Sequence, residues 1–290
     1  MPWSNGHKLM FKAFTRLTIT AYLLGFSCLL QAQTTEPQFI DEAPVNYIYA
    51  AVLGTGFYDL NGRQIAVVRM PFSTGKYDLS EDTHWRVIYP VAVGYENIGE
   101  DNDFEKWIPS EILSVTAVPG VEFFYAPDET WLVKPFLQLG LGRDFTQDKT
   151  TSLLIAGSRI LGDMYKSELW DITLGSSLQW AGEHMQHTDQ YSSFAMFEAG
   201  MDFKRHLPVK VFNRRLNMSF FGVWQHFFLQ RNNSDPLAKV VDVDNLLKLG
   251  FSLGLNKPKK VLGFKVDTVS VGLSFGKNSY ALTFGTGFPF

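Results

Sequence analysis

The C-terminal stretch Ser279-Tyr-Ala-Leu-Thr-Phe-Gly-Thr-Gly-Phe-Pro-Phe290 alternates large apolar residues with small or weakly polar ones. The large residues recur at every second position, interrupted only at Thr286, and are Tyr280, Leu282, Phe284, Phe288 and Phe290. Since neighbouring side chains of a β-strand point to opposite faces, this pattern predicts a strand with one apolar and one small, polar face. Such a strand suits a barrel wall with lipid outside and a polar lumen inside, and it also suits an amphipathic strand of a soluble sheet.

The N-terminus has the order of a secretory signal peptide. Basic residues come first, the apolar run 17–30 follows, and Ala32 is the small residue before the expected cleavage site. We therefore expect residues 1–32 to be removed on export, with an uncleaved membrane anchor as the alternative. Cys28 is the only cysteine of the chain, so we expect the mature protein to contain no disulfide and no cysteine metal site.

The composition separates the chain from helical membrane proteins and from nucleic-acid-binding proteins. Aromatic residues make up 15% of the sequence, yet no segment after the signal reaches the roughly 20 apolar residues of a spanning helix. Membrane barrels distribute their hydrophobicity by alternation, which agrees with both observations. The formal net charge is -3 and no basic block is present, so no nucleic-acid partner is expected.

The same alternation recurs along the chain, each time with Gly, Ser or charged residues on the second face. The seven further segments begin near Trp85, Leu113, Trp131, Trp170, Ala195, Leu247 and Val269. Trp170 and Trp180 stand at the two ends of an apolar band about 11 residues long, a spacing that matches two interfacial aromatic girdles. We assign to these girdles Trp85, Trp131, Trp170, Trp180 and Trp224.

Turn residues divide residues 45–290 into twelve expected strands of an all-β, antiparallel transmembrane β-barrel. The expected strands are 46–58, 63–72, 84–96, 111–126, 130–143, 152–160, 165–181, 192–206, 209–229, 245–256, 262–276 and 279–290. The short connections, expected on the periplasmic side, are 126–129, 161–163, 207–208 and 256–260. Residues 73–83 are too long for a periplasmic turn, which leaves a ten-strand barrel with residues 63–72 outside the wall as the alternative.

The chain resembles the translocator barrel of autotransporters, and more closely the solitary autotransporter-like outer-membrane barrels that stand without a passenger. The resemblance covers roughly residues 40–290 and rests on the strand organisation, glycine-rich strand ends such as Leu139-Gly-Leu-Gly142, and the terminal Phe290. It implies a barrel in the outer membrane of a Gram-negative envelope, with a structural or porin-like, small-pore role. Only residues 33–44 separate the signal from the first expected strand, so no secreted passenger is expected, and this segment is a candidate plug of the lumen.

The resemblance also implies partners and an insertion signal. The partners would be outer-membrane lipid, lipopolysaccharide and the outer-membrane barrel assembly machinery. The terminal strand is similar to the one by which bacterial outer-membrane barrels are recognised for insertion. Its signal residues would be Tyr280, Leu282, Phe284, Phe288 and Phe290.

An enzyme would need a nucleophile or activated water and an oriented base, for which one expected outer loop offers His184 and His187. Nearby acids and serines also suit a weak metal site, but the spacing matches no motif of barrel phospholipases or proteases. We therefore predict no enzymatic activity, no catalytic or metal-binding residues and no cofactor. An outer-membrane lipid-modifying hydrolase that uses these His residues and a soluble periplasmic β-protein are the alternatives.

Charged residues fall at positions expected to face the lumen. They are Arg86, Glu96, Glu122, Lys134, Asp171, Glu198, Asp202, Lys204, Arg215 and Lys248. Acids and bases inside a barrel can pair to brace the wall, or they can line a small hydrophilic channel. The sequence leaves both arrangements open.

Overall fold

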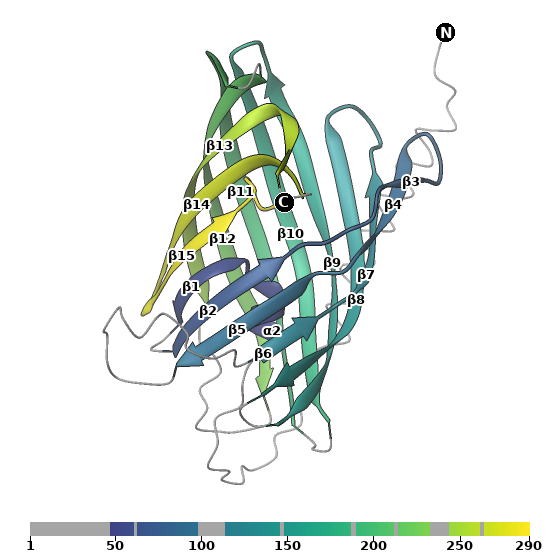
Figure 1. Cartoon of the computed structure of the whole chain (residues 1–290), viewed down its shortest axis with the longest axis vertical. Helices are drawn as coiled ribbons and strands as arrows, with labels where there is room; N and C mark the ends of the chain where they lie inside the picture. Colours follow the sequence, from purple (N-terminus) through teal and green to yellow (C-terminus); the bar gives the residue numbers. More distant parts are fainter. Residues whose placement is uncertain are drawn as a thin grey trace. The chain divides into compact units, whose positions relative to one another are not determined.

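The computed structural model describes residues 47–60, 63–97, 114–145, 148–186, 190–211, 214–232, 244–261 and 264–290. Within residues 40–290 these segments form a single antiparallel sheet that closes on itself (Figure 1). The expected signal peptide (1–32) and the candidate plug (33–44) lie outside the described residues. In the described segments, no helix is both long enough and apolar enough to cross a membrane.

The described elements are one short helix and fifteen strands. The first eight elements are α2 (Tyr47–Val52), β1 (Thr55–Leu60), β2 (Arg63–Met70), β3 (Tyr77–Asp78), β4 (Thr83–Ile88), β5 (Val91–Asn97), β6 (Ser114–Ala117) and β7 (Gly120–Tyr125). The remaining eight are β8 (Trp131–Asp144), β9 (Thr150–Lys166), β10 (Trp170–Met185), β11 (Tyr191–Val211), β12 (Arg214–Asn232), β13 (Asn245–Val261), β14 (Phe264–Gly276) and β15 (Ser279–Gly285).

These fifteen strands form a closed 12-strand antiparallel barrel. Three wall strands are each interrupted once and consist of β2 with β3, β4 with β5, and β6 with β7. β1 pairs with both β2 and β15, and β8 pairs with β9, which closes the ring. The twelve-strand expectation is therefore confirmed over the ten-strand alternative.

Residues 73–83, which seemed too long for a turn, mostly continue the second wall strand. The Thr74 amide donates to the Val87 carbonyl, and the Tyr89 amide donates to the Phe72 carbonyl, both at 2.9 Å. The turn itself is residues 79–82. We call the barrel end at which β8, β10 and β12 begin the turn end, and the opposite end the loop end. The other turn-end connections are equally short: 126–130, 167–169, 212–213 and 262–263.

Several strands run further than expected because proline is tolerated at irregular positions of a sheet. The expected turns 161–163, 207–208 and 256–260 are wrong, since these residues lie within β9, β11 and β13. Pro208 lies where the pairing of β11 with β12 shifts, between His206 and Lys210. A comparable shift in the pairing of β13 with β14 surrounds Pro258. Pro208 and Pro258 therefore mark irregularities within strands and not turns.

The outer face of the barrel is apolar, as the alternation predicted. In β8, Leu137, Leu139 and Leu141 are exposed, with Leu139 at 67%, while Phe136 and Gln138 between them point inward and are buried. The same two-residue rhythm of exposure continues through β10, β13 and β14. The tryptophans assigned to girdles lie at two levels of the wall. Trp85, Trp131 and Trp170 lie at the turn end, and Trp180 and Trp224 lie nearer the loop end.

The expected first strand, 46–58, is wrong, because its first half is the helix α2 inside the barrel. Residues Tyr47 to Ala51 are almost fully buried, and α2 contacts β2, β5, β6 and β10. The Ile48 amide donates to Glu183 Oε2 at 3.0 Å, and the Tyr49 ring stacks on Phe194 with centroids 4.9 Å apart. The wall begins only at Thr55.

The last strand ends at Gly285, so the expected strand 279–290 is also wrong. Residues 286–290, which we call the C-terminal hook, turn into the barrel. Gly287 has a φ of 115°, a backbone conformation that favours glycine, and its amide donates to Ser270 Oγ at 3.1 Å. The Phe288 ring lies 6.0 Å from that of Phe221, which points inward from β12. Phe288 and Phe290 therefore leave the outer face on which Tyr280, Leu282 and Phe284 remain.

The hook depends on the absence of a side chain at Gly175, where an added Cβ would overlap the Phe290 ring. We predict that Gly175→Ala displaces the hook, at a cost of about 1–3 kcal/mol for overpacking. Displacement should let carboxypeptidase remove Phe290 from the refolded protein several-fold faster. Gly222→Ala is the matched control, because its nearest neighbour, Leu249 Cδ2, is 3.6 Å away. Equal digestion of both variants and the parent would show that the hook is not held in the lumen.

Candidate functional site

The lumen contains three successive layers, and only the middle one is strongly polar. At the loop end, α2 packs into an apolar core formed with wall residues that include Leu153, Ile155, Phe194, Phe227 and Leu246. Charged and amide side chains form the middle layer around a cavity of about 140 Å³. Pro289 of the C-terminal hook also lines this cavity. The expectation of a lumen that is polar throughout is therefore wrong for the loop end.

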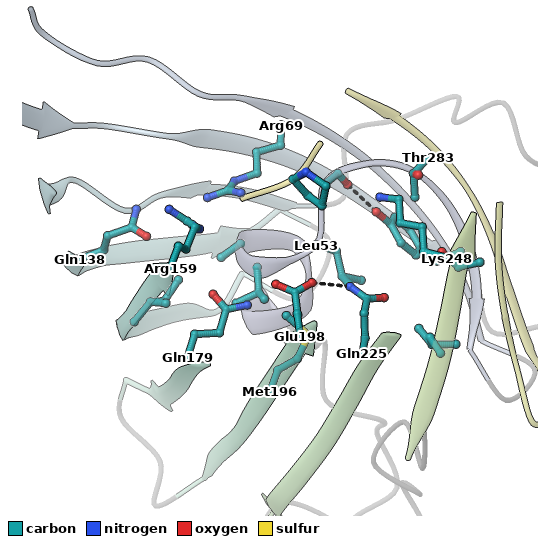
Figure 2. Close-up of a pocket in the computed structure, with 18 residues that line it drawn as sticks. Leu53, Arg69, Gln138, Arg159, Gln179, Met196, Glu198, Gln225, Lys248 and Thr283 are labelled. Carbon is teal, nitrogen blue, oxygen red and sulfur yellow. Dashed lines mark hydrogen bonds between the residues drawn. The ribbon is translucent and has the colours of Figure 1, made fainter. Parts of the chain in front are cut away.

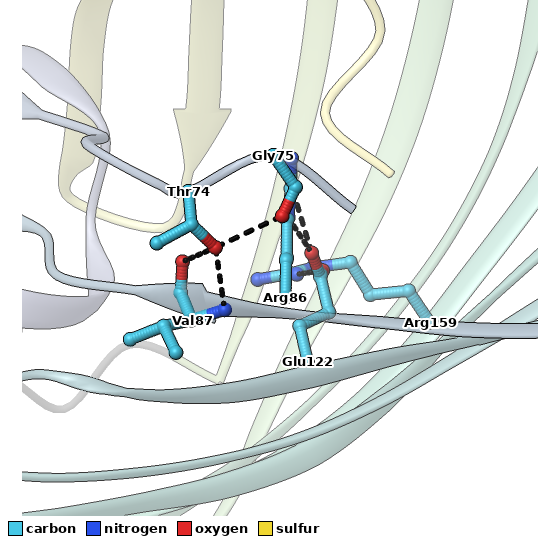
Figure 3. A network of polar contacts seen from close by, with 6 residues as sticks. All are labelled: Thr74, Gly75, Arg86, Val87, Glu122 and Arg159. Carbon is cyan, nitrogen blue, oxygen red and sulfur yellow. Dashed lines mark hydrogen bonds and ion pairs between the residues drawn. The ribbon is translucent and has the colours of Figure 1, made fainter. Parts of the chain in front are cut away.

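Glu122 is the centre of the largest ion-pair group in the described residues (Figure 3). Its side chain is only 2% exposed. Arg86 Nε donates to Glu122 Oε2 at 2.7 Å, and Arg159 Nη1 donates to Oε1 at 3.0 Å. Two guanidinium groups thus share one buried carboxylate, and each carboxylate oxygen accepts a charge-assisted hydrogen bond.

The wall fixes this group through register and packing. Arg86 and Glu122 are directly opposite each other in the β4–β7 pair, and Arg159 reaches the carboxylate from β9. The Arg86 guanidinium lies over the Phe124 ring at 5.0 Å, and that of Arg159 lies over Phe136 at 4.4 Å. Stacking on the two rings holds each planar group in one orientation. The group is therefore preorganised, as a structural clamp between non-neighbouring strands requires.

Another carboxylate of the middle layer, that of Glu198, faces the central cavity from β11, and Arg159 of the Glu122 group lines this cavity as well (Figure 2). The Glu198 carboxylate accepts hydrogen bonds from Ser177 Oγ and from Gln225 Nε2, both at 2.7 Å. Lys248 lines this cavity as well, and Lys134 lies opposite Arg159 in the β8–β9 pair. The middle layer thus brings together five of the expected lumen charges: Arg86, Glu122, Lys134, Glu198 and Lys248.

The other expected lumen charges lie elsewhere. Towards the turn end, Asp171 Oδ2 lies 2.9 Å from His206 Nε2, and Lys204 is opposite Asp171 in the β10–β11 pair. Asp202 is buried close by on the same strand as Lys204. Arg215 is exposed at the beginning of β12, away from these groups. The side chain of Glu96 lies outside the described residues.

The apolar layer also contains acidic neighbours of α2. Burial raises the pKa of the Tyr47 hydroxyl, and the nearby Asp144 and Glu183 carboxylates raise it further. The hydroxyl therefore stays protonated at neutral pH. With the Ile48–Glu183 hydrogen bond, this places polar contacts at the N-terminal turn of an otherwise apolar helix.

Arg69 and Arg159, which both line the central cavity, are not among the charges expected from the sequence. Arg69 follows Ile65 and Val67 in phase on the inward face of β2, and Arg159 follows Leu153 and Ile155 on β9. Since the expected strands 63–72 and 152–160 carry apolar residues on both faces, alternation does not reveal which face is inside. The only available sequence signal is that each arginine lies an even number of residues after two apolar residues, and so on the same face of its strand.

Of the residues considered for catalysis, the structure describes His184 and the nearby serines. His184 is exposed and lines a groove of about 400 Å³ together with Trp180, Ser192 and Ser193. His187 and Asp189 lie outside the described residues. The absence of enzymatic activity therefore stays a prediction, and a hydrolase that uses this loop stays its alternative.

The comparisons with known proteins address the fold. No family model and no curated protein matches the sequence. Among solved structures, the β domain of the Bordetella autotransporter BrkA is similar, with a TM-score of 0.50 and 10% identical residues. The match covers 80% of this chain and 96% of that one. At this identity it shows the fold alone, a 12-strand barrel like an autotransporter β domain.

The Glu122 clamp makes a prediction for stability. Glu122→Gln removes the carboxylate that Arg86 and Arg159 share, so we expect it to lower the free energy of unfolding. The loss should be about 2–3 kcal/mol, below that of a fully buried pair, because the two arginine side chains are 32% and 23% exposed. Denaturant titration of the refolded protein in detergent, followed by tryptophan fluorescence, measures this loss. Asp148→Asn is the control, because it removes an exposed carboxylate paired with Arg143 and should cost under about 1 kcal/mol. Similar small losses in both variants would mean that the clamp does not brace the barrel.

Proposed function

We propose that this protein is an integral outer-membrane β-barrel with a structural role, whose lumen is closed at rest and conducts only when its internal elements are displaced. The observation that carries this proposal is the burial of α2 and the C-terminal hook inside a barrel whose outer face is apolar. The likeness to an autotransporter β domain supports the outer membrane as the location.

The outer face supports a lipid environment. Exposed Leu, Val and Phe residues lie opposite one another on neighbouring strands, as for Leu249 with Leu273 and Val271 with Phe284. Soluble monomers rarely expose a continuous apolar band of this kind to water, whereas lipid chains solvate it favourably. We propose outer-membrane lipid and lipopolysaccharide as its surroundings, and the barrel assembly machinery as its partner during insertion.

The lumen supports the closed state. Twelve strands lie between the side-chain-filled eight-strand barrels and the water-filled porins. Here the extra space is occupied by α2, by the Glu122 group and by the hook. Val52 of α2, Arg159 of the Glu122 group and Pro289 of the hook line the remaining cavity of about 140 Å³. The proposal is of a structural protein, and it assigns no catalytic role to His184 or His187.

The closed lumen predicts channel behaviour. In a planar bilayer, the refolded, signal-free protein should show no stable open level. Phe194→Ala removes the ring on which Tyr49 stacks, so α2 should loosen and discrete openings should appear. Phe220→Ala, which removes an exposed ring packed at a tilt against Phe251 on the outer face, is the matched control and should stay silent. Stable openings of the parent protein would contradict the closed state and favour a permanent small pore.

The proposed location predicts a role for the terminal residue. Deleting Phe290 should lower the amount of heat-modifiable protein in the outer-membrane fraction several-fold, if the assembly machinery reads the terminal aromatic residue. Gly175→Ala keeps that residue and disturbs only its packing in the folded barrel, so it should assemble at the parent level. Normal assembly without Phe290 would contradict the proposal that the terminal residue is part of the insertion signal. Recovery of the parent protein in the soluble fraction would remove the outer-membrane proposal itself.

A further inference from the structure

The central cavity is lined by more positive than negative side chains. Arg69, Arg159 and Lys248 line it, and Glu198 is the one carboxylate among its lining residues in the described chain (Figure 2). They come from β2, β9, β13 and β11, so the cavity lies between opposite parts of the wall. The cations therefore converge on an enclosed space and not on bulk water.

The available carboxylates are already engaged. Glu122 is shared between Arg86 and Arg159, and Glu198 accepts hydrogen bonds from Ser177 and Gln225. In the described part of the chain, no ion pair involves Arg69, Lys134 or Lys248. These five partly buried cations and two carboxylates are left with an excess positive charge, which is costly where it is shielded from bulk water.

Arg69 shows this excess most clearly. Its backbone amide and carbonyl are both bonded to Thr55 Oγ1, which fixes the residue at the seam of the wall. Its side-chain Nε is buried and has no hydrogen-bond partner among the described residues. A guanidinium with unused donors, facing Arg159 across a cavity, is the arrangement that a bidentate oxyanion satisfies.

The neutral hydrogen-bond donors and the size of the cavity further restrict which ligands it can bind. The side chains of Gln138 and Gln179 also line it, and amides donate to anionic oxygens. About 140 Å³ accommodates a phosphate-sized ion with a few waters, but it is well below the roughly 300 Å³ of the smallest sites for drug-sized ligands. Nucleotides and oligosaccharides are therefore too large.

We propose that the lumen cavity binds a small tetrahedral oxyanion, of which inorganic phosphate is the representative, through Arg69, Arg159 and Lys248. The oxyanion compensates the positive charge of the arginines and lysines that Glu122 and Glu198 leave unbalanced. Because Val52 of α2 and Pro289 of the hook both line the cavity, the ion also lies between the two segments that enter the lumen. Binding is independent of whether the lumen ever conducts.

The test compares phosphate with chloride at matched ionic strength on the refolded, full-length mature protein in detergent. Phosphate should raise the temperature at which the heat-modifiable band unfolds, and calorimetric titration should give a saturable isotherm. Arg69→Gln and Lys248→Gln should each weaken phosphate binding roughly tenfold or more, since each removes a charged donor. Arg205→Gln removes one positive charge that lies over Trp170, outside the cavity, and should bind as the parent does.

Glu198→Gln provides a change of opposite sign. It removes the one carboxylate of the cavity lining while keeping a side chain of the same shape, so phosphate should bind several-fold more tightly. A variant that only perturbed folding would not improve binding. The proposal is overturned if phosphate and chloride act alike on the parent protein, or if Arg205→Gln loses as much affinity as Arg69→Gln.

Discussion

A closed wall of twelve strands encloses more space than its own inward side chains fill, and the rest of this structure depends on that constraint. An empty apolar space of this size would forfeit packing energy, and a fully wet one would leave the barrel open. The chain meets the constraint with segments that are not part of the wall. The helix α2 fills the loop end, the hook enters from the C-terminus, and charged side chains occupy the space between them.

The three layers explain why the lumen is neither dry nor open. Apolar side chains surround most of α2 at the loop end, whereas Glu122 and its two arginines cannot be buried without polar partners. The polar cavity follows from that requirement, because five cations and two carboxylates do not neutralise each other. The positive charge in excess of what the ion pairs of the wall need thus becomes the feature that selects an anion.

Much of the wall is predictable from the sequence, because alternation directly reports which face a strand residue occupies. The inward positions of Glu122, Glu198 and Lys248 follow from it. The helix α2 could not be predicted, since the run Tyr47–Leu53 is apolar at every position and has neither a strand nor a helix period. In the hook, Phe288 and Phe290 continue the period of β15, and only Gly287 and Pro289 hint that the strand has ended. The partners of Glu122 depend on register across strands, which no local pattern contains.

Closure of the wall and filling of the lumen are coupled by chain connectivity. The seam pairs β1 with β15, and Thr55 is opposite Phe284 at its turn-end limit. The segment immediately before β1 is α2, and the segment immediately after β15 is the hook, so both fillers extend from the same point of the wall. Pairing the seam therefore fixes the starting points of both segments at once. A barrel that fails to close cannot hold either filler in place. The wall residues that hold the fillers, Gly175 beneath the hook and Phe194 against α2, therefore matter only once the seam has formed.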